Sequence, residues 1–241
     1  MNGMAKKIRS IGTRIMIAIL TAGLFSFSLA PAQAADKSEA QAIVDKSKGT
    51  LANFMSDANY AWLHRYLKTA KGVLIFPQIL KAGFFIGGSG GTGILLVRNE
   101  STGDWSEPAF YTLGSVTFGL QIGGEATEVI MVATNRKGID SLFASSVKLG
   151  GDVSVALGPL GGGAKGGVAV PDVTADFVSF AKSKGLYAGL NLEGSVLAVR
   201  DGLNEAYYGK AVKPVDIIVK KNVSNPGAND IREALHKAAA K

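Results

Sequence analysis

Residues 70–98 read AKGVLIFPQILKAGFFIGGSGGTGILLVR, and this stretch decides the fold of the chain. It holds three short apolar runs, at 73–76, 84–86 and 94–97. Pro77 ends the first run, and a glycine cluster at 87–93 separates the second run from the third. Short β-rich runs bounded by Gly and Pro are typical of strands. The stretch therefore predicts a hairpin, or a sheet that is kinked by its glycines.

The rest of the chain predicts more strands, with few regular helices between them. We expect strands within 115–133, 147–157, 173–180 and 186–200 and one that starts at Trp105, and helices at 36–55, 58–70, 135–143, 201–208 and 229–240. Strands that follow strands directly indicate an antiparallel sheet, and glycines within strands mark bulges, sharp coiling or close backbone approach. We therefore expect an α+β fold with a strongly curved, mainly antiparallel, Gly-rich β-sheet or partial barrel and flanking N- and C-terminal helices.

Residues 1–34 have the pattern of a secretory signal peptide. A basic segment precedes an apolar run at about 15–29, and residues 32–34 supply the small-x-small cleavage pattern. The pattern predicts cleavage between Ala34 and Ala35. An uncleaved anchor is the alternative, although the apolar run is short for a bilayer. With no Cys in the chain a lipoprotein is excluded, so we expect a periplasmic or secreted protein with no membrane span after cleavage.

The sequence offers no constellation of residues for catalysis, a metal or a cofactor. GSGGTG at 88–93 matches G-x-G-x-x-G, but a strand is predicted after it, whereas a dinucleotide site needs a helix there. GPLGGGAK at 158–165 misses a phosphate-binding loop, because Ala164 separates its glycines from the lysine. The only histidines are His64 and His236, on separate predicted helices. We expect no enzyme, no cofactor and no metal.

The formal net charge of +7 overstates the basic character of the predicted mature chain. Lys6, Lys7, Arg9 and Arg14 all precede residue 35, and no acidic residue accompanies them. Most of the excess positive charge therefore belongs to the predicted leader. A nucleic-acid binder usually shows a stronger basic bias, so we expect no nucleic-acid partner.

Several separated blocks of this sequence resemble the SYLF domain family. The blocks are the stretch at 70–98, SVTFGLQIGGEATEVIMV at 115–132, KLGGDVSVALGP at 148–159 and KSKGLYAGLNLEGSV at 182–196, and Tyr207-Tyr208-Gly209 is similar to the closing aromatic-glycine element of the family. The resemblance covers about residues 40–210. It implies a single SYLF-like domain at 35–210, with N-terminal helices at 36–70 and a sheet at 72–200. Residues 211–241 would form a C-terminal tail that ends in a helix.

The resemblance implies a non-enzymatic lipid-binding module of the bacterial envelope. Eukaryotic members bind phosphoinositides through an amphipathic N-terminal segment and a basic surface, and some bind and bundle actin. For an exported chain, the property that carries over is peripheral association with anionic lipid headgroups, phospholipid or phosphoinositide-like. The predicted lipid-binding residues are Lys46, Lys48, Trp62, Arg65, Lys68, Lys71, Lys81, Lys182 and Lys184. The alternative is a structural or protein-interaction module, actin-binding-like or self-assembling, without specific lipid affinity.

Overall fold

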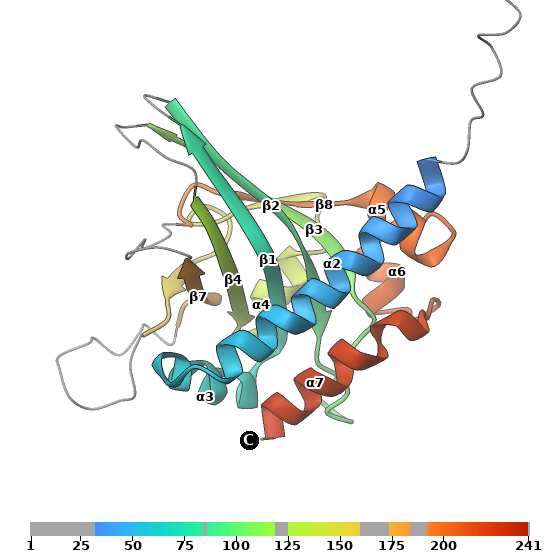
Figure 1. Cartoon of the computed structure of the whole chain (residues 1–241). Coiled ribbons are helices and arrows are strands. Elements are labelled where there is room, and N and C mark those ends of the chain that lie inside the picture. The colour runs from blue at the N-terminus through green and yellow to red at the C-terminus, as the bar shows by residue number, and fades with distance from the viewer. Residues whose placement is uncertain (1–31, 84–85, 119–124, 160–173, 184–191, 241) are drawn as a thin grey trace, which may run out of the picture. The chain divides into compact units, whose positions relative to one another are not determined.

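The computed structural model describes residues 32–83, 86–118, 125–159, 174–183 and 192–240, and the fold below is that of the unit Asp36–Lys241. The described residues form one sheet in the strand order β5-β8-β3-β2-β1-β4-β7-β6. The strands are β1 (Gly72–Gly83), β2 (Ile86–Val97), β3 (Ala109–Phe118), β4 (Glu125–Ala133), β5 (Ser146–Lys148), β6 (Val155–Leu157), β7 (Phe177–Ser183) and β8 (Val196–Val199). Neighbouring strands are antiparallel except β6 and β7, which are parallel. The sheet curls (Figure 1), so the predicted curved, mainly antiparallel α+β fold is confirmed.

The stretch at 70–98 forms a hairpin, but its glycines do not link two strands. β1 and β2 pair from Gly72↔Val97 to Gly83↔Gly87. The whole glycine cluster lies inside β2, and Pro77 lies inside β1 rather than at the end of a strand. The pairing of β1 with β2 and with β4 shifts register around Pro77. The interpretation of the cluster as a connection, and of Pro77 as a strand end, was therefore wrong.

The register shift of β1 around Pro77 explains why the part of β2 beside it needs glycine. Proline gives no N–H to a sheet and is found at bulges. A Cβ atom added to Gly91 would collide with the carbonyl oxygen of Gln78, and one added to Gly93 would collide with that of Ile75. The backbone of β1 occupies the space that side chains of β2 would fill. This constraint comes from the neighbouring strand, so the local sequence does not reveal it.

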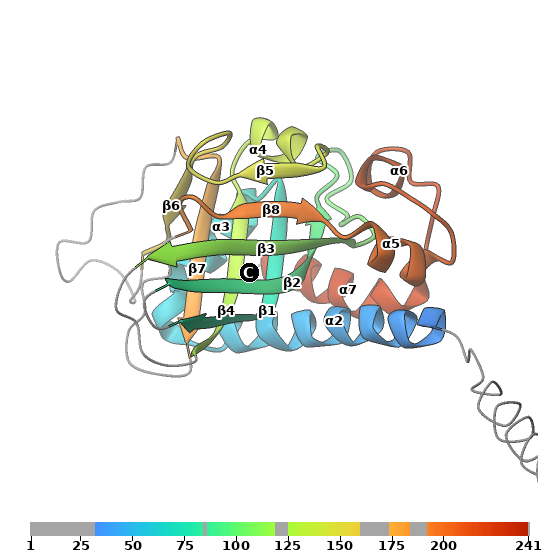
Figure 2. The same ribbon diagram turned by 90° about the horizontal axis from the view of Figure 1, so that it is seen from above.

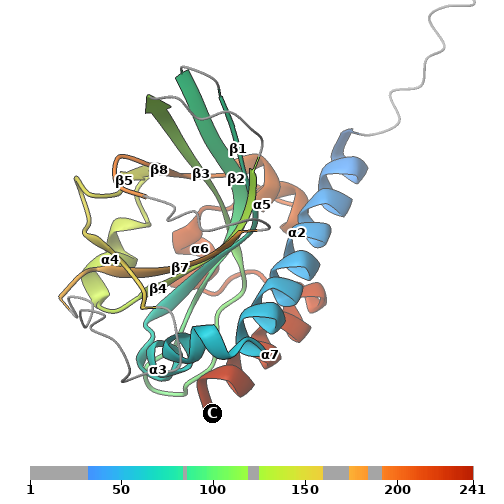
Figure 3. The ribbon, with the colours of Figure 1, turned by 60° about the vertical axis from the view of Figure 1, so that its left-hand side comes forward.

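The two faces of the sheet carry separate hydrophobic cores. Along β1, Val73 and Ile75 belong to one core and Leu74 and Phe76 to the other, as the alternation of a strand requires. The helices over the first face are α2 (Ala32–Met55), α3 (Ala61–Thr69), α5 (Asp201–Tyr208) and α7 (Asn229–Ala240). Figure 3 shows α2 and α7 side by side over this face. The predicted flanking helices thus cover the sheet.

The second face lies under α4 (Arg136–Ser141), β5 and α6 (Pro214–Ile218). Figure 2 shows α4 and β5 on the side of the sheet opposite to α2 and α7. Ile139 from α4 and Ile217 from α6 join Leu74 and Phe76 in this core. The side chain of Asn135 caps α4 by accepting from the Gly138 N–H at 2.9 Å, as the sequence predicts.

Several predicted segments differ in detail from the structure. The strand expected at 147–157 is divided into β5 and β6, which lie at opposite edges of the sheet. The helix expected at 58–70 is divided into the 3-10 turn η1 (Ala58–Tyr60) and α3. Trp105 makes only an isolated bridge with Arg98, because the Val97 N–H is taken by the Ser106 hydroxyl at 3.0 Å. β3 therefore begins at Ala109. Of the strand expected at 186–200, β8 is observed, and residues 186–191 lie outside the described residues.

The segment at 211–241 ends in a helix, as predicted, and also contributes to the folded core. It contains α6, which the sequence did not predict, a 3-10 turn η2 (Pro226–Ala228) and α7. Ile231 and Leu235 of α7 are fully buried in the core between the helices and the sheet. The segment is thus an integral layer of the fold.

Candidate functional site: the outer face of α3 and a cavity beside α6

α3 presents an aromatic and two basic side chains of the predicted lipid-binding set. Leu63 and Leu67 are fully buried, which turns the other side of the helix outward. Trp62 packs against the edge of the core and is half-buried, whereas Arg65 and Lys68 are exposed. The guanidinium carbon of Arg65 lies 4.5 Å from the centroid of the Trp62 ring, a cation–π contact. No ion pair holds either cation within the described residues.

Three other lysines of the predicted set are already paired with carboxylates. The ion pairs are Lys48–Asp230 at 2.5 Å, Lys71–Glu100 at 3.1 Å and Lys182–Asp57 at 2.7 Å. The hydrogen bond from Lys182 lowers the pKa of Asp57, and the hydrogen bond to Asp230 raises the pKa of Lys48. These pairs join α2 to α7, β1 to the loop after β2, and β7 to the end of α2. Their charges are largely compensated inside the protein, so they offer less to an external anion.

The remaining members of the set are dispersed over the fold. Lys46 is exposed on α2. Lys81 lies in β1, opposite Ser89 of β2, and Lys184 lies outside the described residues. The structure therefore brings together Trp62, Arg65 and Lys68 on one helix, and it places the other described members on α2, β1 and β7. We call these three residues the α3 surface.

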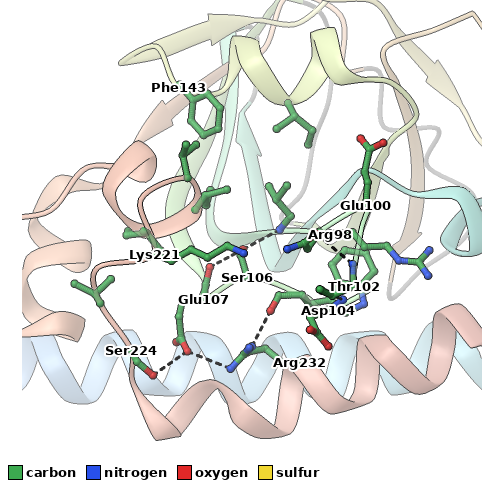
Figure 4. Close-up of a pocket in the computed structure, with 18 of the residues that line it drawn as sticks. Arg98, Glu100, Thr102, Asp104, Ser106, Glu107, Phe143, Lys221, Ser224 and Arg232 are labelled. Carbon is green, nitrogen blue, oxygen red and sulfur yellow. Dashed lines mark hydrogen bonds and ion pairs between the residues drawn. The ribbon is translucent and has the colours of Figure 1, made fainter.

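The structure also contains a cavity that the sequence did not indicate. Its volume is about 540 Å³, within the range of 300–1,000 Å³ typical of small-molecule sites. Its lining comes from the loop at 97–107, from α4 and Phe143, from residues 217–224, and from Arg232 of α7. Figure 4 shows their side chains around the opening. Segments so far apart in sequence carry no common motif, and only the fold reveals that they meet.

A buried ion pair forms one side of this cavity. The carboxylate of Glu107, whose side chain is 9% exposed, accepts from Arg232 Nη1, Ser224 Oγ and the Asn225 N–H, each at 3.2 Å. Arg232 also donates to the carbonyl oxygen of Trp105 at 2.8 Å. A buried carboxylate with three donors is well compensated. The pair fastens α7 to the loop before β3 and gives the cavity a rigid polar wall (Figure 4).

Lys221 differs from the other cations of the lining. Its side chain points into the cavity (Figure 4), and it forms no ion pair or side-chain hydrogen bond within the described residues. By contrast, Arg136 is paired with Asp140 and Arg98 donates to the carbonyl oxygen of Lys68 at 2.7 Å. Lys221 also has a φ of 52°. Among the described residues it is the only non-glycine residue with a positive φ. This left-handed residue follows the end of α6.

The GSGGTG motif and both histidines lie on regular elements, and residues 160–165 of GPLGGGAK lie outside the described residues. GSGGTG lies within β2 and is followed by more of that strand, so it does not open a helix. His64 is on α3 and His236 on α7. Across the described ranges, no group of three or more His, Cys, Asp or Glu residues is placed to hold a metal ion. None of the helices in those ranges is both long and apolar enough to cross a membrane.

Comparison with known proteins identifies the relatives of this chain. The family model "Ysc84: Las17-binding protein actin regulator" matches residues 114–238. An SH3 domain-containing protein of Schizosaccharomyces pombe is 37% identical over 170 residues, which cover 68% of this chain and 38% of that protein. Human SH3 domain-containing YSC84-like protein 1 is 33% identical over 167 residues, or 69% of this chain and 48% of that protein. Protein YSC84 of Saccharomyces cerevisiae is 32% identical over 176 residues, or 72% of this chain and 37% of that protein.

The alignments place this chain against one part of longer proteins. It spans about half or less of the length of the curated relatives that it matches. No solved structure matches the chain.

Proposed function

Because the chain belongs to the Ysc84 family, whose common unit is the SYLF domain, we propose that it is a non-enzymatic binding module that associates peripherally with anionic membrane surfaces. The observation that carries the proposal is the α3 surface. There a half-buried indole carries a guanidinium 4.5 Å from its ring centroid, and a second exposed cation follows one turn later.

This arrangement suits the boundary between headgroups and acyl chains. Trp and Arg combine an apolar body with a polar end, so they lie well at that depth. Each cation close to an anionic surface contributes about 1 kcal/mol. Arg65 and Lys68 together with the Trp62 ring therefore support weak, reversible and salt-sensitive binding. The ion-paired Lys48, Lys71 and Lys182 would contribute less, since binding would have to compete with their carboxylates.

Co-sedimentation with vesicles tests the α3 surface. The full chain is expected to sediment with phosphatidylglycerol-containing vesicles at low salt, to be released by salt, and to remain in solution with phosphatidylcholine alone. The double substitution Arg65→Gln/Lys68→Gln should weaken binding about tenfold to thirtyfold. Lys213→Gln/Lys220→Gln, with one lysine just before α6 and one just after it, is the control, because it removes the same charge from another exposed part of the chain. Equal loss in both double variants, or no binding at low salt, would reject the α3 surface as the binding site.

A protein partner is the second candidate, and the family model favours it. That model is described as a Las17-binding actin regulator, so a filament or a filament regulator is the class of partner to test. Sedimentation with actin filaments, run beside the vesicle series with the same variants, separates the two. Filament binding without vesicle binding would replace the membrane proposal with a protein-interaction module.

We also propose that the chain is exported and cleaved between Ala34 and Ala35. Both residues lie in the first turn of α2, and from Asp36 on, where burial is described, Ala40 is the first fully buried residue of that helix. Cleavage would therefore leave the hydrophobic core intact. Mass spectrometry of the protein recovered from its host should show Ala35 as the first residue, and a chain that retains residues 1–34 would contradict this.

A further inference from the structure

The cavity beside α6 has the size and the lining of a ligand site, and it is separate from the α3 surface. At about 30 Å³ for each water-sized group, its volume of about 540 Å³ admits a ligand of at most about 18 such groups. Its apolar wall consists of Val97, Ile139, Phe143, Ile217, Ile218, Val219 and Val223. Most of this wall belongs to the second hydrophobic core or packs against it. The wall is therefore rigid and apolar, as sites for small ligands usually are.

The charges around the cavity leave one cation free to face a ligand. Among the acidic residues of the lining, Glu107 is paired with Arg232 and Glu100 with Lys71. Asp104 and Arg98 form no ion pair with each other in the described residues, but their opposite formal charges cancel in the net charge of the lining. Lys221 then has an ammonium group with no protein partner in the described residues, on a side chain that points into the cavity (Figure 4). An apolar wall with one uncompensated cation is complementary to an apolar body that carries one negative charge.

The backbone of Lys221 supports this assignment. A non-glycine residue in the left-handed region costs of order 1 kcal/mol, and glycine or asparagine is the usual choice after a helix. The chain instead places lysine here, with φ of 52°. By contrast, the ammonium group of the neighbouring Lys220 is held in an ion pair with Asp216 at 2.8 Å. The left-handed residue closes the end of α6, where the Asn222 N–H donates to the carbonyl oxygen of Asp216 at 3.2 Å, and lysine occupies this position in place of the usual glycine or asparagine.

We propose that this cavity binds a small anionic amphiphile, with its carboxylate or phosphate on Lys221 and its apolar chain against the wall formed by α4 and α6. The proposal does not depend on the membrane function, because no residue of the α3 surface lines the cavity. The same chemistry occurs in a free fatty acid and in a single-chain phospholipid, and the experiment separates these sources.

Trp105 lines the cavity and supplies the readout. The chain has two tryptophans, so Trp62→Phe leaves Trp105 as the only indole. In the full chain with this substitution, decanoate below its micellar concentration should change the emission of Trp105 saturably. Decanol tests the need for charge, and inorganic phosphate tests the need for the apolar chain. A lysophosphatidic acid with a ten-carbon chain tests the phosphate source against the carboxylate.

Lys221→Gly is the decisive variant. Glycine favours the positive φ, so the substitution removes the ammonium without disturbing the fold. It should weaken decanoate binding about tenfold or more, whereas the control Lys220→Gln should leave binding unchanged. Weak binding of decanol and none of phosphate would support the site, and the tighter of the two anionic probes would name the source. Absence of a saturable change, or equal affinity in Lys221→Gly, would overturn the proposal.

Discussion

Asp176 shows how one buried carboxylate holds several segments of this fold. Its side chain is only 4% exposed. It accepts from Asn135 Nδ2, Lys137 Nζ, the Ser154 N–H and Ser154 Oγ, all at 2.9–3.0 Å. These donors outweigh burial and lower the pKa of Asp176 to about 2. The carboxylate thereby joins the start of α4 and the segment before β6 to the start of β7.

Asp176→Asn should destabilise the protein by about 2–3 kcal/mol at pH 7, because the amide replaces a charged acceptor among four donors. Since the folded-state pKa of about 2 lies below the ordinary value of 3.8, the carboxylate contributes stability above pH 4 that is lost as the pH falls towards 2. The loss from this group amounts to about 2 kcal/mol. Denaturant unfolding of both proteins between pH 7 and pH 2 measures it.

The difference in unfolding free energy between wild type and Asp176→Asn should shrink across that acid range. A difference that stays constant from pH 4 to pH 2 would contradict the low pKa of Asp176 and its contribution to stability. Asp140→Asn on α4 is the control, because Asp140 is 55% exposed in an ion pair with Arg136. It should change stability by no more than about 0.5 kcal/mol.

At the scale of the element, β2 is shaped by its neighbour more than by its own sequence. The apolar part of β2, at 94–97, begins at Ile94, which pairs with Ile75 at the border of the register shift. Before that it is largely glycine, and Gly91 and Gly93 face the carbonyl groups on either side of Pro77. The glycines of this strand thus differ in the room they leave for a side chain, and Gly91 and Gly93 leave none for a Cβ atom.

Gly91→Ala should cost more than about 2 kcal/mol, or prevent folding, because the added methyl group would collide with the backbone of Gln78. Gly114→Ala, on the adjoining strand β3, is the matched control. No atom lies within 4 Å of a Cβ added there, so the same methyl group should be neutral or slightly stabilising. Urea unfolding of the two variants compares them directly, and similar midpoints would show that the bulge is not what constrains β2.

The sequence predicted elements well where the signal was local. The Asn135 cap of α4, the left-handed Gly209 at the end of α5 and the periodicity of α7 are local signals, and all three helices were expected close to their observed positions. Trp105 was wrongly predicted to start a strand, because the hydroxyl of Ser106 satisfies the Val97 N–H instead. For the glycines of β2 the sequence predicted close backbone approach in general, but it did not identify β1 as the strand that approaches Gly91 and Gly93.

At the scale of the whole molecule, two cores on opposite faces of one sheet depend on helices from both ends of the chain. α7 buries Ile231 and Leu235 against the first core, and Arg232 of the same helix compensates the buried Glu107. Removal of α7 would expose apolar surface and also leave that carboxylate without its cation.

A chain that ends at residue 228 should therefore lose its cooperative unfolding transition. Loss of the buried pair alone would cost about 3–5 kcal/mol, in addition to the lost apolar burial. A chain that lacks residues 1–34 is the control, and it should match the full chain within about 0.5 kcal/mol, since the buried residues of α2 begin at Ala40. Thermal unfolding followed by circular dichroism distinguishes the two truncations. A cooperative transition in the chain without α7 would contradict the role given to it.

The candidate sites were less predictable than the fold. Trp62, Arg65 and Lys68 could be grouped because helical spacing alone places them near one another. Whether a lysine is ion-paired depends on partners that can be far away in the sequence, as Asp230 is from Lys48. No local sequence pattern predicts such a pair. The cavity was missed entirely, because its lining comes from four separated segments whose meeting follows from the sheet order.

The contact of α2 with α7 also sets the timing of folding during synthesis. Lys48 and Asp230, which join the two helices, are 182 residues apart, so about 10–40 s of translation separate them. β3 likewise waits for β8, since Tyr111 pairs with Val199. Throughout that interval the apolar side of α2, with Val44, Leu51 and Phe54, has no finished layer to cover it. The nascent chain therefore exposes this apolar side of α2 until α7 emerges.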